Sequence, residues 1–218
     1  MGYRVRLRSD FLDYYDHHFD RDGIMYWRLA NGGITRAAAL KLLKLCNFPV
    51  PRWSMRVPDG IKPEAMVVVH HDQNAHRGDG KELVAARNAP PNTLVEEYID
   101  GSYGESTRYL QIGDKSFWLS YKSKDDWRSN VGDVDITLIR EADNEHKHIS
   151  VLPLFAIDFV TAKDRTQYAI DFNSAPGIGG TPIEALLKPA QVVALIKAWL
   201  ERRYVKMQNQ GLSPQELD

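Results

Sequence analysis

The segment YAIDFNSAPGIGG, residues 168–180, constrains the fold more than any other stretch of the chain. Its first six residues alternate large apolar side chains with small or polar ones, which predicts a β-strand. The alternation places Asp171 and Asn173 together on the face opposite the large residues. The glycine-rich turn that follows can bring backbone amides close to a ligand. Two hard oxygen ligands beside such a loop suit magnesium holding phosphate oxygens, although a polar strand end meeting a surface turn has the same pattern.

A second acidic residue interrupts an apolar segment just before this strand. The run LPLFAIDFV, residues 152–160, predicts a buried strand and contains Asp158. An unpaired carboxylate in a buried strand is costly, so Asp158 needs a cationic partner or a metal ion. The turn centred on Asp164 leads directly into the 168–173 strand, which predicts an antiparallel pair. We therefore expect Asp158 and Asp171 to face each other across that pair.

The remaining segments predict a mixture of strands and helices. A helix begins after Thr35, a good N-cap, and ends at Asn47 before the prolines of FPVPRW. Its expected apolar stripe is Ala38, Leu42, Leu45 and Cys46, widened by Ala39 and Leu43. Strands are predicted at 66–69 and 94–99, a hairpin at 108–112 and 116–121 around Gly113-Asp114, and a mainly helical segment at 181–204. The periodicity of 81–87 fits either a short helix or a strand.

Composition excludes several classes of protein. The 28 basic and 29 acidic side chains give a net charge of -1, so a nucleic-acid partner is not indicated and no bulk attraction to a membrane surface is expected. The single cysteine, Cys46, permits no internal disulfide and fits a reducing compartment. No apolar run approaches the roughly 20 residues of a membrane span. We therefore expect a cytoplasmic protein that does not interact with membranes.

A series of motifs, in order along residues 34–203, resembles the ATP-grasp superfamily, especially its RimK-type ligases, which add amino acids to carboxylates. The motifs are ALKLLKLCNFPVPRW, LVEEYIDG, STRYLQIGDK, DDWRSNVG, FAIDFV and YAIDFNSAPG. The last two and the R-S-N loop are the specific part of the resemblance. It implies an α+β fold in which two lobes with mainly antiparallel sheets grip a nucleotide between them.

The resemblance also implies a division of the chain and a set of ligands. An N-terminal segment, residues 1–33, would pack on the core, followed by a reduced small lobe at 34–94. The C-terminal ATP-grasp lobe would comprise 95–205, and 206–218 would be a flexible tail. The implied cofactors are ATP and Mg²⁺, with two ions expected and Mn²⁺ as a substitute.

Site residues carry over onto matching positions of this chain. Asp158 would bind one magnesium ion, Asp171 would bridge two in place of the family's usual glutamate, and Asn173 would bind the second. The catalytic residues would be Arg108 and Arg128, which contact phosphates or the acyl-phosphate intermediate, with Asn130 nearby. The hinge residues Glu96, Glu97 and Ile99 would meet adenine, mainly through their backbone, and Asp100 the ribose. Lys81, Lys122 and Lys124 are the candidates for the phosphates.

The chain departs from the family pattern in its first half. Only about 33 residues precede the core, and the lobe between Pro51 and Leu94 is short. The lysine expected at the end of the first lobe strand is replaced, because His70 and His71 follow Val69. Gly78-Asp79-Gly80-Lys81 is the candidate for the glycine-rich phosphate lid.

The predicted function is that of an ATP-dependent ligase, of the EC 6.3 type, which activates a carboxylate as an acyl phosphate and joins it to an amine. Its partners would be small-molecule or peptide carboxylates and amines, and the family's tendency to assemble allows a homo-oligomer. Two alternatives stay open. One is a degenerate ATP-grasp module that binds nucleotide without ligase activity, and the other is an ATP-grasp kinase.

Overall fold

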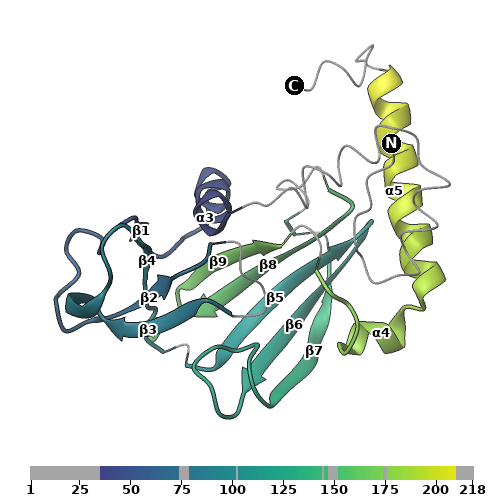
Figure 1. The fold of residues 1–218 in the computed structure, drawn as a ribbon. Coiled ribbons are helices and arrows are strands. Elements are labelled where there is room, and N and C mark those ends of the chain that lie inside the picture. Colours follow the sequence, from purple (N-terminus) through teal and green to yellow (C-terminus); the bar gives the residue numbers. More distant parts are fainter. Residues whose placement is uncertain are drawn as a thin grey trace.

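Two antiparallel sheets form the framework of the protein (Figure 1). The computed structural model describes residues 35–73, 79–101, 103–143, 145–146, 152–173 and 176–209. The smaller sheet has the strand order β1-β4-β2-β3, and the larger has the order β7-β6-β5-β8-β9. Each strand pairs antiparallel with its neighbours, which confirms the predicted α+β class with mainly antiparallel sheets. The predicted N-terminal segment 1–33 lies outside the described residues.

The first described helix, α3, spans Arg36–Leu45 and confirms the predicted start. The hydroxyl of Thr35 accepts a hydrogen bond from the backbone amide of Ala38, which satisfies one of the free donors at the helix start. The predicted buried stripe is wrong, because Ala38 is exposed and the side chain of Leu45 is 72% exposed. The buried face is instead formed by Arg36, Ala39, Leu40 and Leu43. Both stripes share Ala39 and Leu43, so apolar periodicity could not choose between them, and the observed face also buries Arg36.

The four-stranded sheet consists of β1 (Trp53–Ser54), β2 (Met66–His70), β3 (Lys81–Ala85) and β4 (Leu94–Glu97). Residues 81–87, whose periodicity fitted either a helix or a strand, therefore form the strand β3 and the start of a short 3-10 helix, Ala86–Asn88. Val67 and Val69 face a small core with Val95 and Ala86. Alternation along β2 places Val68 and His70 on the opposite face, beside Glu96 of β4.

The five-stranded sheet consists of β5 (Glu105–Ile112), β6 (Lys115–Ser123), β7 (Val134–Ala142), β8 (Leu154–Thr161) and β9 (Gln167–Asn173). The predicted hairpin is confirmed, with β5 and β6 joined through Gly113 and Asp114. Strand β7 was not predicted. It lies at the edge of the sheet, where one side of its alternating pattern is exposed, so it lacks the continuous apolar run of the buried β8.

Strands β8 and β9 form the predicted antiparallel pair, and Asp158 lies directly opposite Asp171. The register shifts between Asp158 and Phe159, so β9 does not alternate strictly along its length. Ala169 and Phe172 both enter the core, whereas Ile170 and Asp171 both face the cleft described below. The predicted single face of Tyr168, Ile170 and Phe172 is therefore wrong, because this irregularity changes the face between the two halves of the strand.

Helices cover the two faces of the larger sheet. On one face, Ala39 and Leu43 of α3 pack on aromatic side chains that include Tyr109, Phe155 and Phe172. On the other face, α4 (Pro182–Leu186) and α5 (Pro189–Asn209) cover Leu110, Leu119 and Ala156 (Figure 1). The helix α5 thus continues through residues 206–209, where the tail was predicted to begin. None of the helices in the described part of the chain combines the length and apolar character needed to cross a membrane.

We expect Gly113→Ala to lower the free energy of unfolding by about 2–4 kcal/mol, which urea denaturation would measure. Gly113 has φ +59°, and an added Cβ would lie 2.5 Å from the backbone oxygen of Leu195 in α5. Gly180 is the matched control, since its φ is +77° and no atom lies within 4 Å of an added Cβ. Gly180→Ala should cost only the left-handed conformation, about 1–2 kcal/mol. Equal losses would show that α5 does not press on this turn.

Candidate functional site

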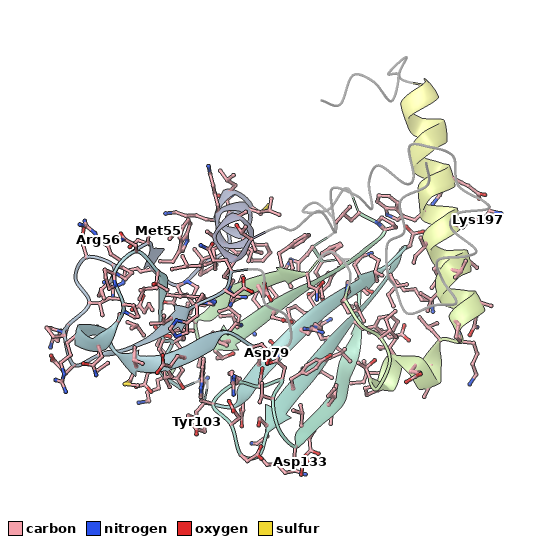
Figure 2. All side chains as sticks on the ribbon, viewed as in Figure 1. Met55, Arg56, Asp79, Tyr103, Asp133 and Lys197 are labelled. Atoms are coloured by element: carbon pink, nitrogen blue, oxygen red, sulfur yellow. The ribbon has the colours of Figure 1, made fainter. Side chains whose placement is uncertain are left out.

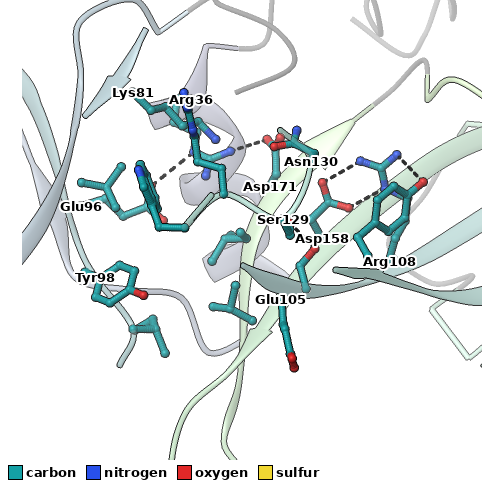
Figure 3. A pocket seen from close by; sticks show the side chains of 18 of the residues that line it. Arg36, Lys81, Glu96, Tyr98, Glu105, Arg108, Ser129, Asn130, Asp158 and Asp171 are labelled. Carbon is teal, nitrogen blue, oxygen red and sulfur yellow. Dashed lines mark hydrogen bonds and ion pairs between the residues drawn. The ribbon is translucent and has the colours of Figure 1, made fainter. Parts of the chain in front are cut away.

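A cleft lies between the two sheets and is lined by side chains from both, together with the first turn of α3 and the loop after β6 (Figure 3). Its walls combine apolar residues, such as Val68, Ile99 and Val160, with a group of charged side chains deeper in the cleft. A partly apolar concave site with convergent charged groups is typical of ligand-binding sites. The charged groups therefore define the candidate functional site.

The larger sheet supplies an arginine–aspartate pair. Arg108, Tyr121 and Asp158 lie on the same sheet face as Leu110, Leu119 and Ala156, beyond the end of the covered core. Arg108 donates to both carboxylate oxygens of Asp158, at 2.6 and 2.9 Å, and its Nη1 donates to the Tyr121 hydroxyl at 3.3 Å. Two parallel charge-assisted bonds hold the planar groups in a fixed geometry. Burial alone would lower the pKa of Arg108. The carboxylate of Asp158 raises this pKa, which ends above its ordinary value, so the guanidinium stays charged.

Arg36 supplies a second cation and reaches the cleft from the start of α3. Its Nη1 lies 2.9 Å from Oδ1 of Asp171, and its Nε donates to Oε2 of Glu96 at 3.3 Å (Figure 3). Burial would lower the pKa of Arg36, but Asp171 and Glu96 raise it above its ordinary value. Burial would raise the pKa of Asp171, but Arg36, together with Lys81 and Arg108, keeps the pKa of that carboxyl below its usual range. Arg36 thus connects a strand of each sheet through one charged group.

A buried histidine completes this network. His70, at the end of β2, has a side chain only 2% exposed, and its Nε2 lies 2.9 Å from Oε2 of Glu96. Burial lowers the pKa of His70 more than Glu96 raises it, so the neutral ring donates to the carboxylate. Burial would raise the pKa of Glu96, but Arg36 and His70 together lower it. The ring of His70 is therefore fixed at the end of β2, inside the small sheet.

Lys81 lies at the start of β3 and lines the cleft near these groups (Figure 3). Its backbone position is opposite His70 in the β2–β3 pair. Burial, followed by the charge of Arg36, lowers the pKa of Lys81 to about 8, although nearby carboxylates oppose the shift. Lys81 is therefore a cation whose charge depends on what else occupies the cleft.

The R-S-N loop crosses the same cleft. Arg128 forms two bonds to Asp126, from Nε at 2.8 Å and from Nη2 at 2.7 Å. The hydroxyl of Ser129 lies 2.6 Å from that of Ser106 on β5, which joins the loop to the sheet. Arg128, Ser129 and Asn130 all line the cleft, and the ring of Trp127 meets the ring of Tyr98 edge-on at 6.2 Å. The predicted catalytic loop thus borders the predicted hinge.

The structure brings most of the predicted site residues together. The cleft-lining residues include Arg108, Arg128, Asn130, Glu96, Glu97, Ile99, Lys81, Asp158 and Asp171. The carboxylate of Glu97 pairs with Arg52 at 2.7 Å, so its position on the cleft is held from outside. The roles assigned to these residues stay predictions.

Four predicted residues lie outside the set of described residues that line the cleft: Asp100, Lys122, Lys124 and Asn173. Lys122 pairs with Glu105, and Asp100 pairs with Lys163. Lys124 lies 2.9 Å from Asp133, which marks the outer end of the β6–β7 connection (Figure 2). Asn173 follows Asp171 by two residues on β9, so its side chain lies on the same face of the strand. The proposed roles of these four residues stay predictions.

Sequence analysis missed Arg36, although one signal pointed to it. Arg36 is the first residue of α3, where the positive end of the helix dipole disfavours a cation, and the first turn contains no acidic residue. A cation at such a position needs a compensating anion elsewhere in the fold. Tyr121 and His70 gave no comparable signal, because an aromatic residue in a strand and a histidine at a strand end are ordinary.

The donor set fits magnesium bound together with phosphates. The described residues contain no cluster of three or more His, Cys, Asp or Glu side chains that could hold an ion alone. Mg²⁺ commonly takes one or two carboxylates and completes its shell with water and substrate phosphates. Asp158 and Asp171, directly opposite each other on paired strands, supply such carboxylates. The residues present therefore fit a nucleotide-linked ion better than a metal cage made by the protein alone.

Solved structures with a similar fold include several ATP-grasp ligases. The ligase PsnB, complexed with a phosphomimetic variant of its minimal precursor, Mg and ADP, matches with a TM-score of 0.56 and 15% identity, over 80% of this chain and 62% of PsnB. D-alanine–D-alanine ligase from Bacillus anthracis, complexed with ATP, matches with a TM-score of 0.56 and 14% identity, over 84% of this chain and 70% of that ligase. A RiPP-associated ATP-grasp ligase from Chryseobacterium gregarium, in complex with ADP and a leader and core peptide, matches with a TM-score of 0.51 and 14% identity, over 75% of this chain and 58% of that ligase.

These likenesses show that the chain has the ATP-grasp fold. The chain spans less than two thirds of the length of PsnB. No protein-family model matches the sequence, and no curated protein matches it.

The lowered pKa of Lys81 predicts unusual reactivity for its amine. Because its pKa is about 8, Lys81 should react with acetic anhydride half-maximally near pH 8, well below the ordinary lysine value of about 10.5. Competitive labelling across pH 6–11, read by mass spectrometry, would measure this. The exposed Lys62 is the internal reference in the same sample. Parallel labelling of both lysines would contradict the buried, charge-crowded position of Lys81.

Proposed function

We propose that this protein is an ATP-dependent ligase that activates a carboxylate as an acyl phosphate and joins it to an amine. The observation that carries the proposal is the pair Asp158 and Asp171, which face each other across β8 and β9 in a cleft between two sheets of ATP-grasp fold. Arginines bond to both carboxylates, so acids for metal ions and cations for phosphate charge occur in the same place. Phosphoryl transfer depends mainly on such positioning and electrostatic stabilisation.

Charge balance supports a nucleotide accompanied by two divalent ions. The inner cleft carries three cations, Arg36, Lys81 and Arg108, against the carboxylates of Glu96, Asp158 and Asp171. A triphosphate with four negative charges would unbalance this set, and buried uncompensated charge is costly. Two Mg²⁺ ions would restore neutrality, and Asp158, Asp171 and Asn173 would hold them. This is the proposed basis for two ions.

The nucleoside would lie along the hinge. Val68, Ile99 and Val160 supply apolar surface in the cleft, and β4 leads into Ile99 with backbone groups near its rim. We propose that adenine packs there and bonds to the backbone of the 96–99 segment. The phosphates would then extend toward Arg36, Lys81 and Arg108. Glu96 contributes to this arrangement through Arg36 rather than by contact with adenine, because its carboxylate is taken by Arg36 and His70.

The proposed chemistry has two steps. A carboxylate oxygen of the substrate attacks the terminal phosphorus of ATP, and ADP leaves with the electrons of the broken bond. The amine then attacks the acyl carbon, releases inorganic phosphate and loses a proton. Bound Mg²⁺ would stabilise the charge that develops on the phosphate oxygens. Arg108 and Arg128 would hold the transferred group, and the loop of Ser129 and Asn130 would keep water from the acyl phosphate.

The proposal extends to the RimK-type subgroup and to its substrates through the motifs WRSN and YAIDFN. PsnB and the C. gregarium ligase are complexed with precursor or leader and core peptides, whereas the B. anthracis enzyme is a D-alanine–D-alanine ligase. We therefore propose peptide carboxylates and free amino acids as the two donor classes to screen, each with amine acceptors.

One observation favours a second candidate function, a nucleotide-binding module without ligase activity. Each carboxylate expected to hold metal is already engaged by an arginine. If those pairs persisted with nucleotide bound, the ions needed for transfer could not enter. Nucleotide would then bind without ADP release, in contrast to the ligase.

Asp171→Asn should weaken Mg²⁺-dependent binding of the non-hydrolysable analogue AMPPNP at least tenfold, because the amide removes the charge of the proposed bridging ligand. Calorimetric titration with and without Mg²⁺ would measure this. Asp164→Asn is the matched control, since Asp164 caps the exposed β8–β9 turn by accepting from the Thr166 amide. Equal weakening by both variants, or no Mg²⁺ dependence in the wild-type protein, would contradict the proposed site.

Isotope transfer distinguishes ligase, kinase and binding module. With a substrate carboxylate labelled by ¹⁸O, a ligase that forms an acyl phosphate transfers one labelled oxygen to the released inorganic phosphate. Mass spectrometry of that phosphate gives the readout, and a reaction without amine is the control. A stable phosphorylated product without amide would indicate a kinase. ATP binding without ADP release across the donor panel would support the binding module.

A further inference from the structure

Arg36 occupies a place that no other charged side chain of the cleft shares. It projects from α3, which belongs to neither sheet, and bonds to Glu96 of the small sheet and Asp171 of the large one. Its side chain is only 7% exposed, compared with 14% for Arg108. Arg36 is thus the most enclosed cation among the cleft's ion pairs, and its two partners lie on opposite sides of the cleft.

A guanidinium in this position depends on its anions. Removing a charge from water is costly unless opposite charges compensate it. Glu96 gives only part of that compensation, because the oxygen that Arg36 contacts also accepts from His70. The shorter contact is the one to Asp171, at 2.9 Å against 3.3 Å to Glu96. The charge of Arg36 therefore relies strongly on Asp171.

A divalent ion at Asp171 would compete for the same carboxylate. Oδ1 of Asp171 faces Arg36, and a metal bound to this carboxylate would place two more positive charges beside the guanidinium. Lys81 and Arg108 already contribute positive charge at Asp171, so little negative potential is spare. An ion alone should therefore bind weakly. A polyphosphate that arrives with the ion would offer Arg36 new anionic oxygens in exchange for the shared one.

We propose that Arg36 couples the two ligands: it opposes a divalent ion at Asp171 in the nucleotide-free protein and binds the polyphosphate when nucleotide and ion enter together. This inference rests on the proposed function, because it takes the polyphosphate to be that of a nucleoside triphosphate. In the nucleotide-bound protein Arg36 contacts the polyphosphate. In the nucleotide-free protein it occupies the carboxylate of Asp171 and so disfavours metal binding there. The exchange of one anion for another also lets the contact between the sheets change without leaving a buried charge unpaired.

The proposal predicts that loss of Arg36 changes the Mn²⁺ affinity in opposite directions in the nucleotide-free and the nucleotide-bound protein. A purely structural role would not produce opposite changes. Mn²⁺ serves as the probe ion, because electron paramagnetic resonance measures the free aqueous ion, and the bound ion follows by difference from the total. In Arg36→Gln without nucleotide, Mn²⁺ should bind about tenfold more tightly than in the wild-type protein. With saturating AMPPNP, Mn²⁺ should bind about tenfold more weakly than in the wild-type complex. Coupling energies between sites commonly correspond to 5- to 150-fold effects, so both shifts are measurable.

Two further variants keep the test interpretable. Arg52→Gln is the matched control, because Arg52 pairs with Glu97, the residue after Glu96, from outside the cleft. It should leave both Mn²⁺ affinities unchanged. If Arg36→Gln fails to fold because Glu96 is left buried with only His70, the double variant Arg36→Gln/Glu96→Gln removes that charge. The same two shifts are expected in the double variant.

The outcomes separate this inference from the proposed function. A wild-type protein that binds AMPPNP with Mn²⁺, together with an Arg36 variant that shows neither shift, would overturn the role of Arg36 and leave the proposed function standing. A variant in which both affinities fall would likewise overturn it, because Arg36 would then only support the site's structure. If the wild-type protein binds no AMPPNP with or without Mn²⁺, the proposed function and this inference fail together.

Discussion

Compensation of the cleft carboxylates by arginines is the interaction on which the rest of the site depends. Asp158 and Asp171 face each other on paired strands, where two bare carboxylates would repel. Arg108 and Arg36 remove that repulsion from opposite sides, one within the large sheet and one from α3. The buried face of α3 carries Arg36 together with Ala39, Leu40 and Leu43. The same helix face thus supplies a charge to the cleft and apolar side chains to the core.

Much of the framework could be predicted from sequence because it depends on local patterns. The N-cap at Thr35, the hairpin around Gly113-Asp114 and the opposition of Asp158 and Asp171 all follow from turn residues and the two-residue period of strands. Strand β7 escaped prediction because an edge strand has only one covered side. The stripe of α3 was wrong because two faces share the same apolar residues, and only a contact distant in sequence distinguishes them. Such contacts leave no periodic signal.

The site shows the same division. Residues inside short motifs, such as Arg108, Arg128 and Asp158, are brought to one cleft as expected. The network of Arg36, Glu96 and His70 joins residues that are 60 and 26 positions apart, so it exists only in the folded chain. Lys122 and Lys124 illustrate the converse. They lie close to the R-S-N loop in sequence, yet Lys122 pairs with Glu105 and Lys124 pairs with Asp133, and neither lysine lines the cleft.

The irregularity between β8 and β9 lets two consecutive residues of β9 face the same side of the sheet. Ala169 and Phe172 enter the aromatic core, whereas Ile170 and Asp171, which lie between them in sequence, both face the cleft. In a strictly alternating strand, one of these two neighbours would have to face the core. The extra residue on β9 therefore adds the apolar surface of Ile170 to the cleft beside the charged Asp171, while Ala169 and Phe172 stay in the packing beneath α3.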